Sequence, residues 1–343
     1  QESHQAIDVL NMFRPVTKWN TQLDSPNIIH ESVRKAFKVA QHEKPGATHL
    51  ELPEDVAAED TEMRPLPPRE SVRAAAPNEE ALTRVRRRLV GADRPVLIAG
   101  NGAVRTRASE PLRSFVEATD VPVLSTYMGK GAVSDADPHS LMTLDSGAGG
   151  EAADAIARAD LVLTFGYDIA EHDPADWNCR CPIVHVDSEP AEVYEAYNPE
   201  IEVVADLGRT LERLTDWAED EEVRFDPDWY GDLRDRIVEE VLREPSSEAP
   251  FELRETLSVL REAMAPEDVL VSDVGSHKMA IAQNFPTYEP NTCIISNGLA
   301  SMGIAVPGGL AADLAVEGRV VAATGDGGFL MNAAEIETAT RMG

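Results

Sequence analysis

The residues best suited to chemistry are Gly325-Asp326-Gly327-Gly328. They follow an apolar run, Arg319–Thr324, that is typical of a buried strand, and a helical pattern comes after them. Glycines at a strand-to-helix turn let backbone N–H groups approach an anion closely, and the positive end of the helix favours a phosphate there. Asp326 offers the single carboxylate that a Mg²⁺ ion needs to join the protein to a diphosphate. The turn therefore predicts a diphosphate site, although most isolated Gly-Asp-Gly triplets are surface turns.

A second segment of this kind, Gly275-Ser276-His277, follows the apolar run Asp268–Asp273. A histidine placed after a strand is more often a surface residue than a ligand contact. Here the histidine follows Asp273-Val274-Gly275-Ser276, and in that sequence the binding of a phosphate becomes the favoured interpretation.

A third segment, Ser296-Asn297-Gly298-Leu299-Ala300-Ser301-Met302-Gly303, lies between the other two in the sequence. Read alone, its methionine is a core residue. Taken in order and with their spacing, the three segments resemble the diphosphate-binding domain of thiamine-diphosphate enzymes. Within that family, the chain resembles the large, catalytic subunits of acetolactate synthases along almost its whole length.

The resemblance implies a role for each of these residues. Thiamine diphosphate and Mg²⁺ are the implied cofactors, Asp326 is the implied metal ligand, and Met302 has the catalytic role of a wedge between the two cofactor rings. The implied cofactor-binding residues are Gly275, Ser276, His277, Asn297, Gly298, Met302, Gly325, Asp326, Gly327 and Gly328. Weaker catalytic candidates are His4 and Gln5, which resemble a segment that the family places near the substrate across a dimer interface. Terminal packing is the alternative interpretation for these two residues.

The implied reaction is the decarboxylation of one pyruvate on thiamine diphosphate. The hydroxyethyl carbanion then condenses with a second pyruvate to give 2-acetolactate. The family builds its sites between subunits, so the resemblance implies a homodimer or a homotetramer. The family's catalytic glutamate and its second metal-binding residue, an asparagine, have no counterpart in this sequence. We therefore expect the chain to be a fragment that is inactive by itself.

The sequence also bears on two subtypes of this family. Biosynthetic members bind FAD in the central domain through a glycine-rich turn, which Gly100-Asn101-Gly102 keeps in part. Asp168 stands where those members carry an arginine beside the flavin diphosphate, and a carboxylate there repels the diphosphate. We expect the FAD-independent, catabolic type, with the FAD-binding biosynthetic type as the alternative. A non-catalytic scaffold or nucleotide-binding protein is a third hypothesis, although Arg105 interrupts the G-x-G-x-x-G pattern.

Apolar runs and amphipathic helices must position these segments. The patterns predict helices over 27–43, 79–89, 108–119, 150–159, 207–218, 229–242, 251–264, 300–316 and 333–341. They predict strands over 47–52, 95–100, 121–126, 161–166, 183–187, 201–204, 268–273 and 319–324. This order is typical of α/β domains with three layers, α/β/α, and mostly parallel sheets. Asn332 and Glu335 also have the spacing of a capping box at a helix start.

The resemblance also implies a division into domains. We expect part of the pyrimidine-binding domain at 1–58, a linker at 59–78, a Rossmann-like central domain at 79–218, a linker at 219–250 and part of the diphosphate-binding domain at 251–343. The two linkers are the polar or proline-rich stretches of the chain.

Composition excludes some functions. Lys and Arg number 31 and Asp and Glu 61, so the formal net charge of −30 repels nucleic acids and anionic membranes. The acidic residues are spread along the chain, as in salt-adapted (halophilic) cytoplasmic proteins, and an ordinary acidic enzyme is the alternative. Three cysteines are too few for a disulfide framework and indicate a reducing compartment. Cys179 and Cys181 lack the second pair of ligands that a structural zinc site needs.

Overall fold

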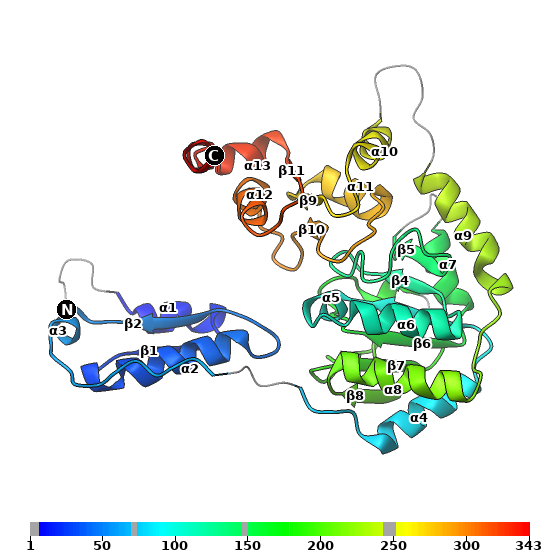
Figure 1. The fold of residues 1–343 in the computed structure, drawn as a ribbon, viewed down its shortest axis with the longest axis horizontal. Coiled ribbons are helices and arrows are strands. Elements are labelled where there is room, and N and C mark those ends of the chain that lie inside the picture. Colours follow the sequence, from blue (N-terminus) through cyan, green and yellow to red (C-terminus); the bar gives the residue numbers. More distant parts are fainter. Residues whose placement is uncertain (1–6, 70–73, 146–149, 178, 243–251) are drawn as a thin grey trace. The chain divides into compact units, whose positions relative to one another are not determined.

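The computed structural model describes residues 7–69, 74–145, 150–177, 179–242 and 252–343 (Figure 1). His4 and Gln5 lie outside the described residues. Contacts divide the chain into two compact units, Gln1–Ala74 and Ala75–Gly343. Every pairing between two named strands is parallel, and helices cover the sheets, so the predicted α/β class with mostly parallel sheets is confirmed.

In the first unit, two parallel strands are joined by one long helix. Trp19–Gln22 (β1) pairs with Thr48–Glu51 (β2), and Ile29–Gln41 (α2) connects them, because parallel strands need a crossover. The shorter elements are α1 (Val9–Phe13), η1 (Arg14–Val16), η2 (Pro26–Ile28) and α3 (Glu54–Ala57). The sequence predicted α2 and β2 but not β1, because the four residues of β1 are mostly polar.

Six parallel strands form the larger sheet of the second unit, in the order β5-β4-β3-β6-β7-β8. Their bounds are Pro95–Ala99 (β3), Val123–Ser125 (β4), Ser140–Thr143 (β5), Leu161–Phe165 (β6), Ile183–Asp187 (β7) and Ile201–Val204 (β8). The chain runs from β3 outward to β5, returns to β6 and then continues in the other direction. The loops after β3 and β6 therefore diverge, which is the place where sheets of this kind commonly bind ligands.

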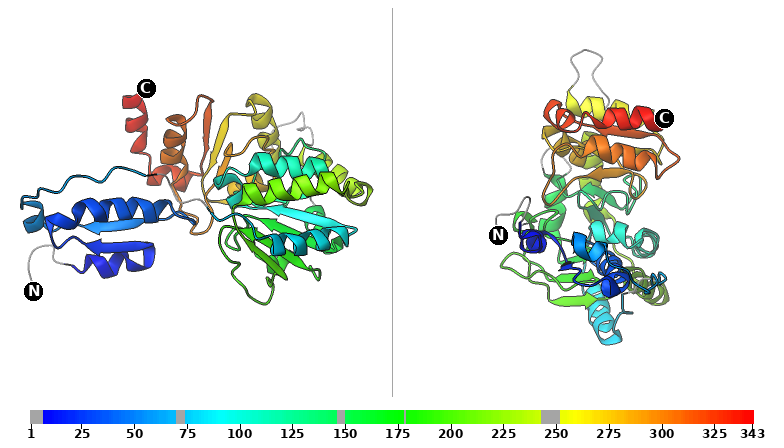
Figure 2. Two further views of the ribbon diagram at one scale, coloured as in Figure 1. Left: turned by 60° about the horizontal axis from the view of Figure 1, so that its bottom comes forward. Right: turned by 90° about the vertical axis from the view of Figure 1, so that its left-hand side faces the viewer.

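Helices cover both faces of this sheet, because its buried strands are apolar on both sides. Leu97 and Phe165 pack with α4, α6 and α8, whereas Val96 and Ile98 pack with α7 and α9. Figures 1 and 2 show α6 and α8 side by side on one face. The helices are α4 (Glu79–Val90), α5 (Asn101–Arg105), α6 (Ser109–Thr119), α7 (Glu151–Arg158), η3 (Pro174–Trp177), α8 (Leu207–Asp220) and α9 (Asp228–Val241). Although α9 falls in the predicted linker 219–250, it is packed into the core of this sheet.

A smaller sheet of three parallel strands, in the order β10-β9-β11, follows in the same unit. Its elements are α10 (Leu253–Ala263), β9 (Val269–Ser272), α11 (Ser276–Asn284), β10 (Cys293–Ile295), α12 (Ala305–Asp313), β11 (Val320–Ala323), α13 (Asp326–Met331) and α14 (Glu335–Met342). Leu270 packs with α10 and α11, whereas Val269 and Val271 pack with α12 on the other face. The sequence missed β10, α11 and α13, and it started α12 five residues too early.

A buried ion pair connects the parts of the second unit that hold the two sheets. Lys130 Nζ lies 3.5 Å from a carboxylate oxygen of Asp135, and each side chain is 2% exposed. Lys130 Nζ also donates to the carbonyl of Ala282 in α11 at 3.4 Å, and Oδ2 of Asp135 accepts the N–H of Thr287 at 2.8 Å. The N–H of Asp135 donates in return to the carbonyl of Thr287 at 3.0 Å. These contacts fix the segment after α11 to the loop between β4 and β5.

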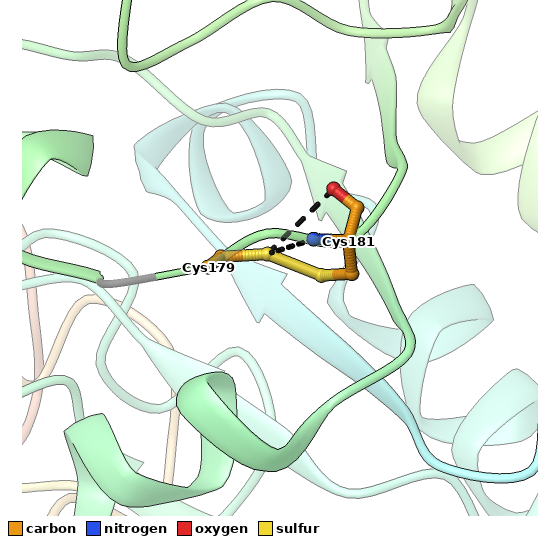
Figure 3. Close-up of a disulfide and its surroundings, with 2 residues drawn as sticks. All are labelled: Cys179 and Cys181. Carbon is orange, nitrogen blue, oxygen red and sulfur yellow. Dashed lines mark hydrogen bonds between the residues drawn. A yellow bond between two sulfur atoms is a disulfide. The ribbon is translucent and has the colours of Figure 1, made fainter.

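Cys179 and Cys181 form a disulfide in the segment before β7 (Figure 3). The sequence indicated no disulfide framework, and the structure shows this one local bond. Because a single residue separates the two cysteines, the bond restricts the unfolded chain very little. Cys293 is free and buried. None of the helices that the structure describes has both the length and the apolar character needed to cross a bilayer.

Candidate cofactor site

The three glycine-bearing segments meet at one edge of the sheet β10-β9-β11. They follow the carboxyl ends of β9, β10 and β11, and parallel strands place these ends at the same edge. Helices α11 and α13 begin at this edge, so their positive ends lie there as well. Residues that are up to 53 positions apart, such as Gly275 and Gly328, are thus brought to one place.

The ring of His277 lies beside the turn at Gly325. Its Cε1 atom is 3.8 Å from the point where a side chain on Gly325 would begin. Its Nε2 atom is shielded from solvent and has no hydrogen-bond partner in the described part of the chain. Since buried polar atoms are nearly always hydrogen-bonded, this nitrogen fits an oxygen of a bound phosphate group.

Asp326 is the first residue of α13, and its side chain is exposed at the turn. Its Oδ1 accepts the N–H of Gly327 at 2.8 Å. The sequence predicted that Gly327 binds the cofactor, whereas its N–H is bound to the carboxylate of Asp326 here. Among the described residues, no three His, Cys, Asp or Glu side chains come together as a metal site. A single exposed carboxylate fits a Mg²⁺ ion that takes its other ligands from a diphosphate and water.

Met302 lies next to the same turn. Its Cε atom is 4.0 Å from the point where a side chain on Gly327 would begin. The residue is 50% exposed, so it is not the core residue that its type alone suggests. Gly298 has open space around its α-carbon, and Ser276 is exposed at the start of α11. The side chain of Asn297, by contrast, is occupied by hydrogen bonds within the protein.

Asp273 is the important site residue that the sequence did not identify. It directly follows β9 and is 0% exposed. Its Oδ1 accepts the N–H groups of Val274 (2.7 Å) and Gly303 (2.8 Å). Its Oδ2 accepts the N–H of Ala305 (3.4 Å) and the hydroxyl of Thr324 (3.2 Å). Burial alone would raise the pKa of this carboxyl group, but the hydrogen bonds outweigh burial and lower the pKa.

Helix α13 packs directly on this carboxylate. A Cβ atom on Gly328 would lie 2.6 Å from Oδ2 of Asp273, so only glycine fits there. Asn332, after α13, donates from Nδ2 to the carbonyl of Gly303 at 2.7 Å. The capping box predicted for Asn332 and Glu335 is therefore wrong, because α14 begins at Glu335 itself. The side chain of Asn332 does not cap a helix. It holds residues 296–303, which we call the Met302 segment.

In the larger sheet, Glu171 fills the place between β3 and β6 where a ligand anion would bind. The residue is 6% exposed. Its carboxylate accepts the N–H groups of Asn101 (2.9 Å) and Met128 (3.3 Å) and the hydroxyl of Thr126. Burial raises its pKa to about 7, although these hydrogen bonds act in the opposite direction. The N–H group at the start of α5 is thus already bound to a carboxyl group of the protein itself.

The glycines of the supposed flavin turn have a packing role. A Cβ atom on Gly100 would lie 2.4 Å from the carbonyl oxygen of Gly166, and one on Gly102 would lie 2.5 Å from the Gly166 α-carbon. Close approach of two loops therefore explains both glycines without a nucleotide. Asp168, the residue that stands in place of an arginine, accepts the N–H of Ala170 at 3.1 Å.

Two family models match the second unit. The central domain of thiamine pyrophosphate enzymes matches residues 82–214. The C-terminal TPP-binding domain of the same enzymes matches residues 273–343. The second match begins at Asp273 and includes all three glycine-bearing segments.

Several relatives match the whole chain. The acetolactate synthase of Bacillus subtilis is 30% identical, over 100% of this chain and 61% of its own length. The catabolic acetolactate synthase of Raoultella terrigena is 30% identical, over 99% of this chain and 62% of its own length. A probable acetolactate synthase large subunit of Methanocaldococcus jannaschii is 28% identical, over 98% and 60%. The chain thus spans about three fifths of the length of these relatives. Together with the two domain matches, these similarities show that the chain belongs to the thiamine pyrophosphate enzymes.

Proposed function

We propose that the residues of this chain belong to an acetolactate synthase subunit, which uses thiamine diphosphate and Mg²⁺ to join two molecules of pyruvate with loss of CO₂. The observation that carries the proposal is the meeting of His277, Asp326 and Met302 at one edge of a parallel sheet. The names of the relatives support the choice of reaction. The proposal includes a homo-oligomer, since the resemblance implies sites between subunits. Cofactor binding is the property that tests it most directly.

The residues of this chain hold and orient the cofactor in this proposal. Thiamine diphosphate, when bound, supplies the carbon nucleophile and the electron sink for decarboxylation of a keto acid. Asp326 binds the metal ion, while the start of α13 and the ring of His277 bind phosphate oxygens. Met302 packs against the organic part of the cofactor. Asp273 does not contact the cofactor in this proposal. Its hydrogen bonds fix the segments that carry these groups.

We expect thiamine diphosphate with Mg²⁺ to raise the melting temperature of the 343-residue chain, and Asp326→Asn to remove that increase. A ligand at about 100 times its Kd stabilises a protein by about 2.7 kcal/mol, which corresponds to several degrees for a unit of this size. Asp326 is exposed, and among the described residues its side chain bonds within its own turn, so the variant should melt normally without ligand. Differential scanning fluorimetry measures both values.

The matched control is Glu317→Gln, which removes an exposed carboxylate of the same unit and should keep the full increase. Inorganic pyrophosphate with Mg²⁺ is a second probe, because it needs only the diphosphate contacts. If neither compound stabilises the unaltered chain, the proposed function is wrong.

We also propose that the protein works without FAD. The support is Glu171, whose carboxylate takes the N–H groups that a dinucleotide would need. We expect the purified protein to be colourless and added FAD to leave its melting temperature unchanged. An absorption spectrum that lacks the flavin band at roughly 450 nm checks the first expectation. A flavin that copurifies with the chain in equimolar amount would favour the biosynthetic type.

A further inference from the structure

Asn297 stands at the start of the Met302 segment, and its side-chain amide is bound on both sides. Its Oδ1 accepts a hydrogen bond from Lys278 Nζ at 3.0 Å. Its Nδ2 donates to the main-chain carbonyl of Glu171 at 3.1 Å. One partner belongs to α11 and the other to the loop after β6 in the larger sheet. The side chain therefore connects three segments and has no polar atom left without a partner.

Lys278 is an unusual partner, because it is 8% exposed and carries a charge. No carboxylate of the described residues lies within ion-pair distance of its ammonium group. The ring of Tyr127 is a neighbour, with its centroid 5.8 Å from Nζ. Lys278 is also the third residue of α11, where the helix dipole disfavours a cation. The hydrogen bond to Asn297 is thus its main specific polar contact.

The Met302 segment needs such anchors, because it has no regular structure between β10 and α12. Three of its residues have left-handed backbone angles, with φ of +69° at Gly298, +46° at Ala300 and +84° at Gly303. Its far end is held at Gly303 by Asp273 and Asn332. Its near end is held by Asn297. Met302 lies between these two anchors, so both set its position.

We propose that Lys278 and Asn297 form a clamp that positions Met302 for the cofactor. The hydrogen bond from Asn297 to the main-chain carbonyl of Glu171 attaches this clamp to the larger sheet. Lys278 is a positioning residue in this view, since it acts through Asn297. The inference rests on the proposed function and changes the role assigned to Asn297 from direct cofactor contact to support of the segment. It also gives the loop after β6 a part in building the cofactor site.

Hydrogen–deuterium exchange and calorimetry on the full chain test the clamp. We expect Lys278→Met and Asn297→Ala each to speed amide exchange in peptides from 296–303, while peptides from β11 stay unchanged. Each variant should also weaken the binding of thiamine diphosphate with Mg²⁺ roughly 10-fold, as expected for loss of one hydrogen bond to a charged group. The double variant should bind no more weakly than either single variant, because both changes break the same connection.

The controls are Lys38→Met, at an exposed lysine of α2, and Asn284→Ala, whose amide donates only within α11. Both should bind the cofactor as the unaltered chain does. Unchanged exchange in 296–303, or faster exchange throughout the unit, would overturn the clamp. If the unaltered chain binds no thiamine diphosphate, the proposed function fails, while the exchange data still decide whether the clamp exists.

Discussion

Asp273→Asn is expected to lower the free energy of unfolding of the unit Ala75–Gly343 by about 3 kcal/mol and to abolish its stabilisation by thiamine diphosphate. The substitution keeps the size of the side chain. However, it turns one acceptor oxygen into an NH₂ group. That group then faces either the N–H donors of Val274 and Gly303 or the N–H of Ala305 with the hydroxyl of Thr324. The segments that carry Met302 and Asp326 would then lose their common support. Urea unfolding and the fluorimetric assay measure the two effects.

The effect of Asp273→Asn should also depend on pH. The pKa of Asp273 is lowered in the folded state, so its contribution to stability is present above the unfolded-state value near 4. That contribution is lost as the pH falls through the folded-state pKa. The two proteins should therefore differ at pH 7 and become more alike towards pH 3. Thr324→Val is the matched control, because it removes one of the four hydrogen bonds and should cost about 1 kcal/mol. An Asn variant no less stable than this control would contradict the role of Asp273.

Lys130→Met is expected to lower the melting temperature of the same unit by roughly 10 °C. It would leave the carboxylate of Asp135 buried without its cation, and breaking a buried pair in this way costs about 3–5 kcal/mol. The contact to the carbonyl of Ala282 would be lost as well. Thermal unfolding followed by circular dichroism measures the change.

The double variant Lys130→Met/Asp135→Asn, compared with the two single variants, separates the contribution of the ion pair to stability from that of packing. The double variant carries no unpaired charge, so it should be less destabilised than the sum of the two single variants. If the destabilisation of the double variant equals the sum of the two single effects, Lys130 and Asp135 are not energetically coupled. Their interpretation as a unit would then be wrong.

The sequence predicted those strands whose residues are mostly apolar, such as β3, β6 and β7. Burial on both faces of a parallel sheet requires such runs, so their pattern is strong. It missed β5 and β10, because their apolar runs, Leu141-Met142 and Cys293–Ile295, are short and are flanked by polar residues. It also missed α13, whose glycines are poor helix formers, and of these Gly328 is required for close packing on Asp273.

The sequence could predict which segments form the candidate site, but not the hydrogen bonds that connect these segments. Glycines and a carboxylate after apolar runs made Asp326 and His277 candidates, because local geometry determines what such turns can bind. The role of Asp273 depends on donors about 30 and 50 residues away, which no local pattern contains. The same holds for Asn332, whose spacing suggested a cap while its amide bonds to Gly303. Glu171 was missed for the same reason.

The contacts around Lys130 and Asp135 have a consequence for how the second unit responds to cutting. They tie α11 and the residues after it to the loop between β4 and β5, without any contribution from the backbone connection between α9 and α10. A protease that severed that connection would leave two polypeptides still associated through this buried, charge-paired contact. The nicked protein would migrate as one particle in a native gel and as two bands only after denaturation.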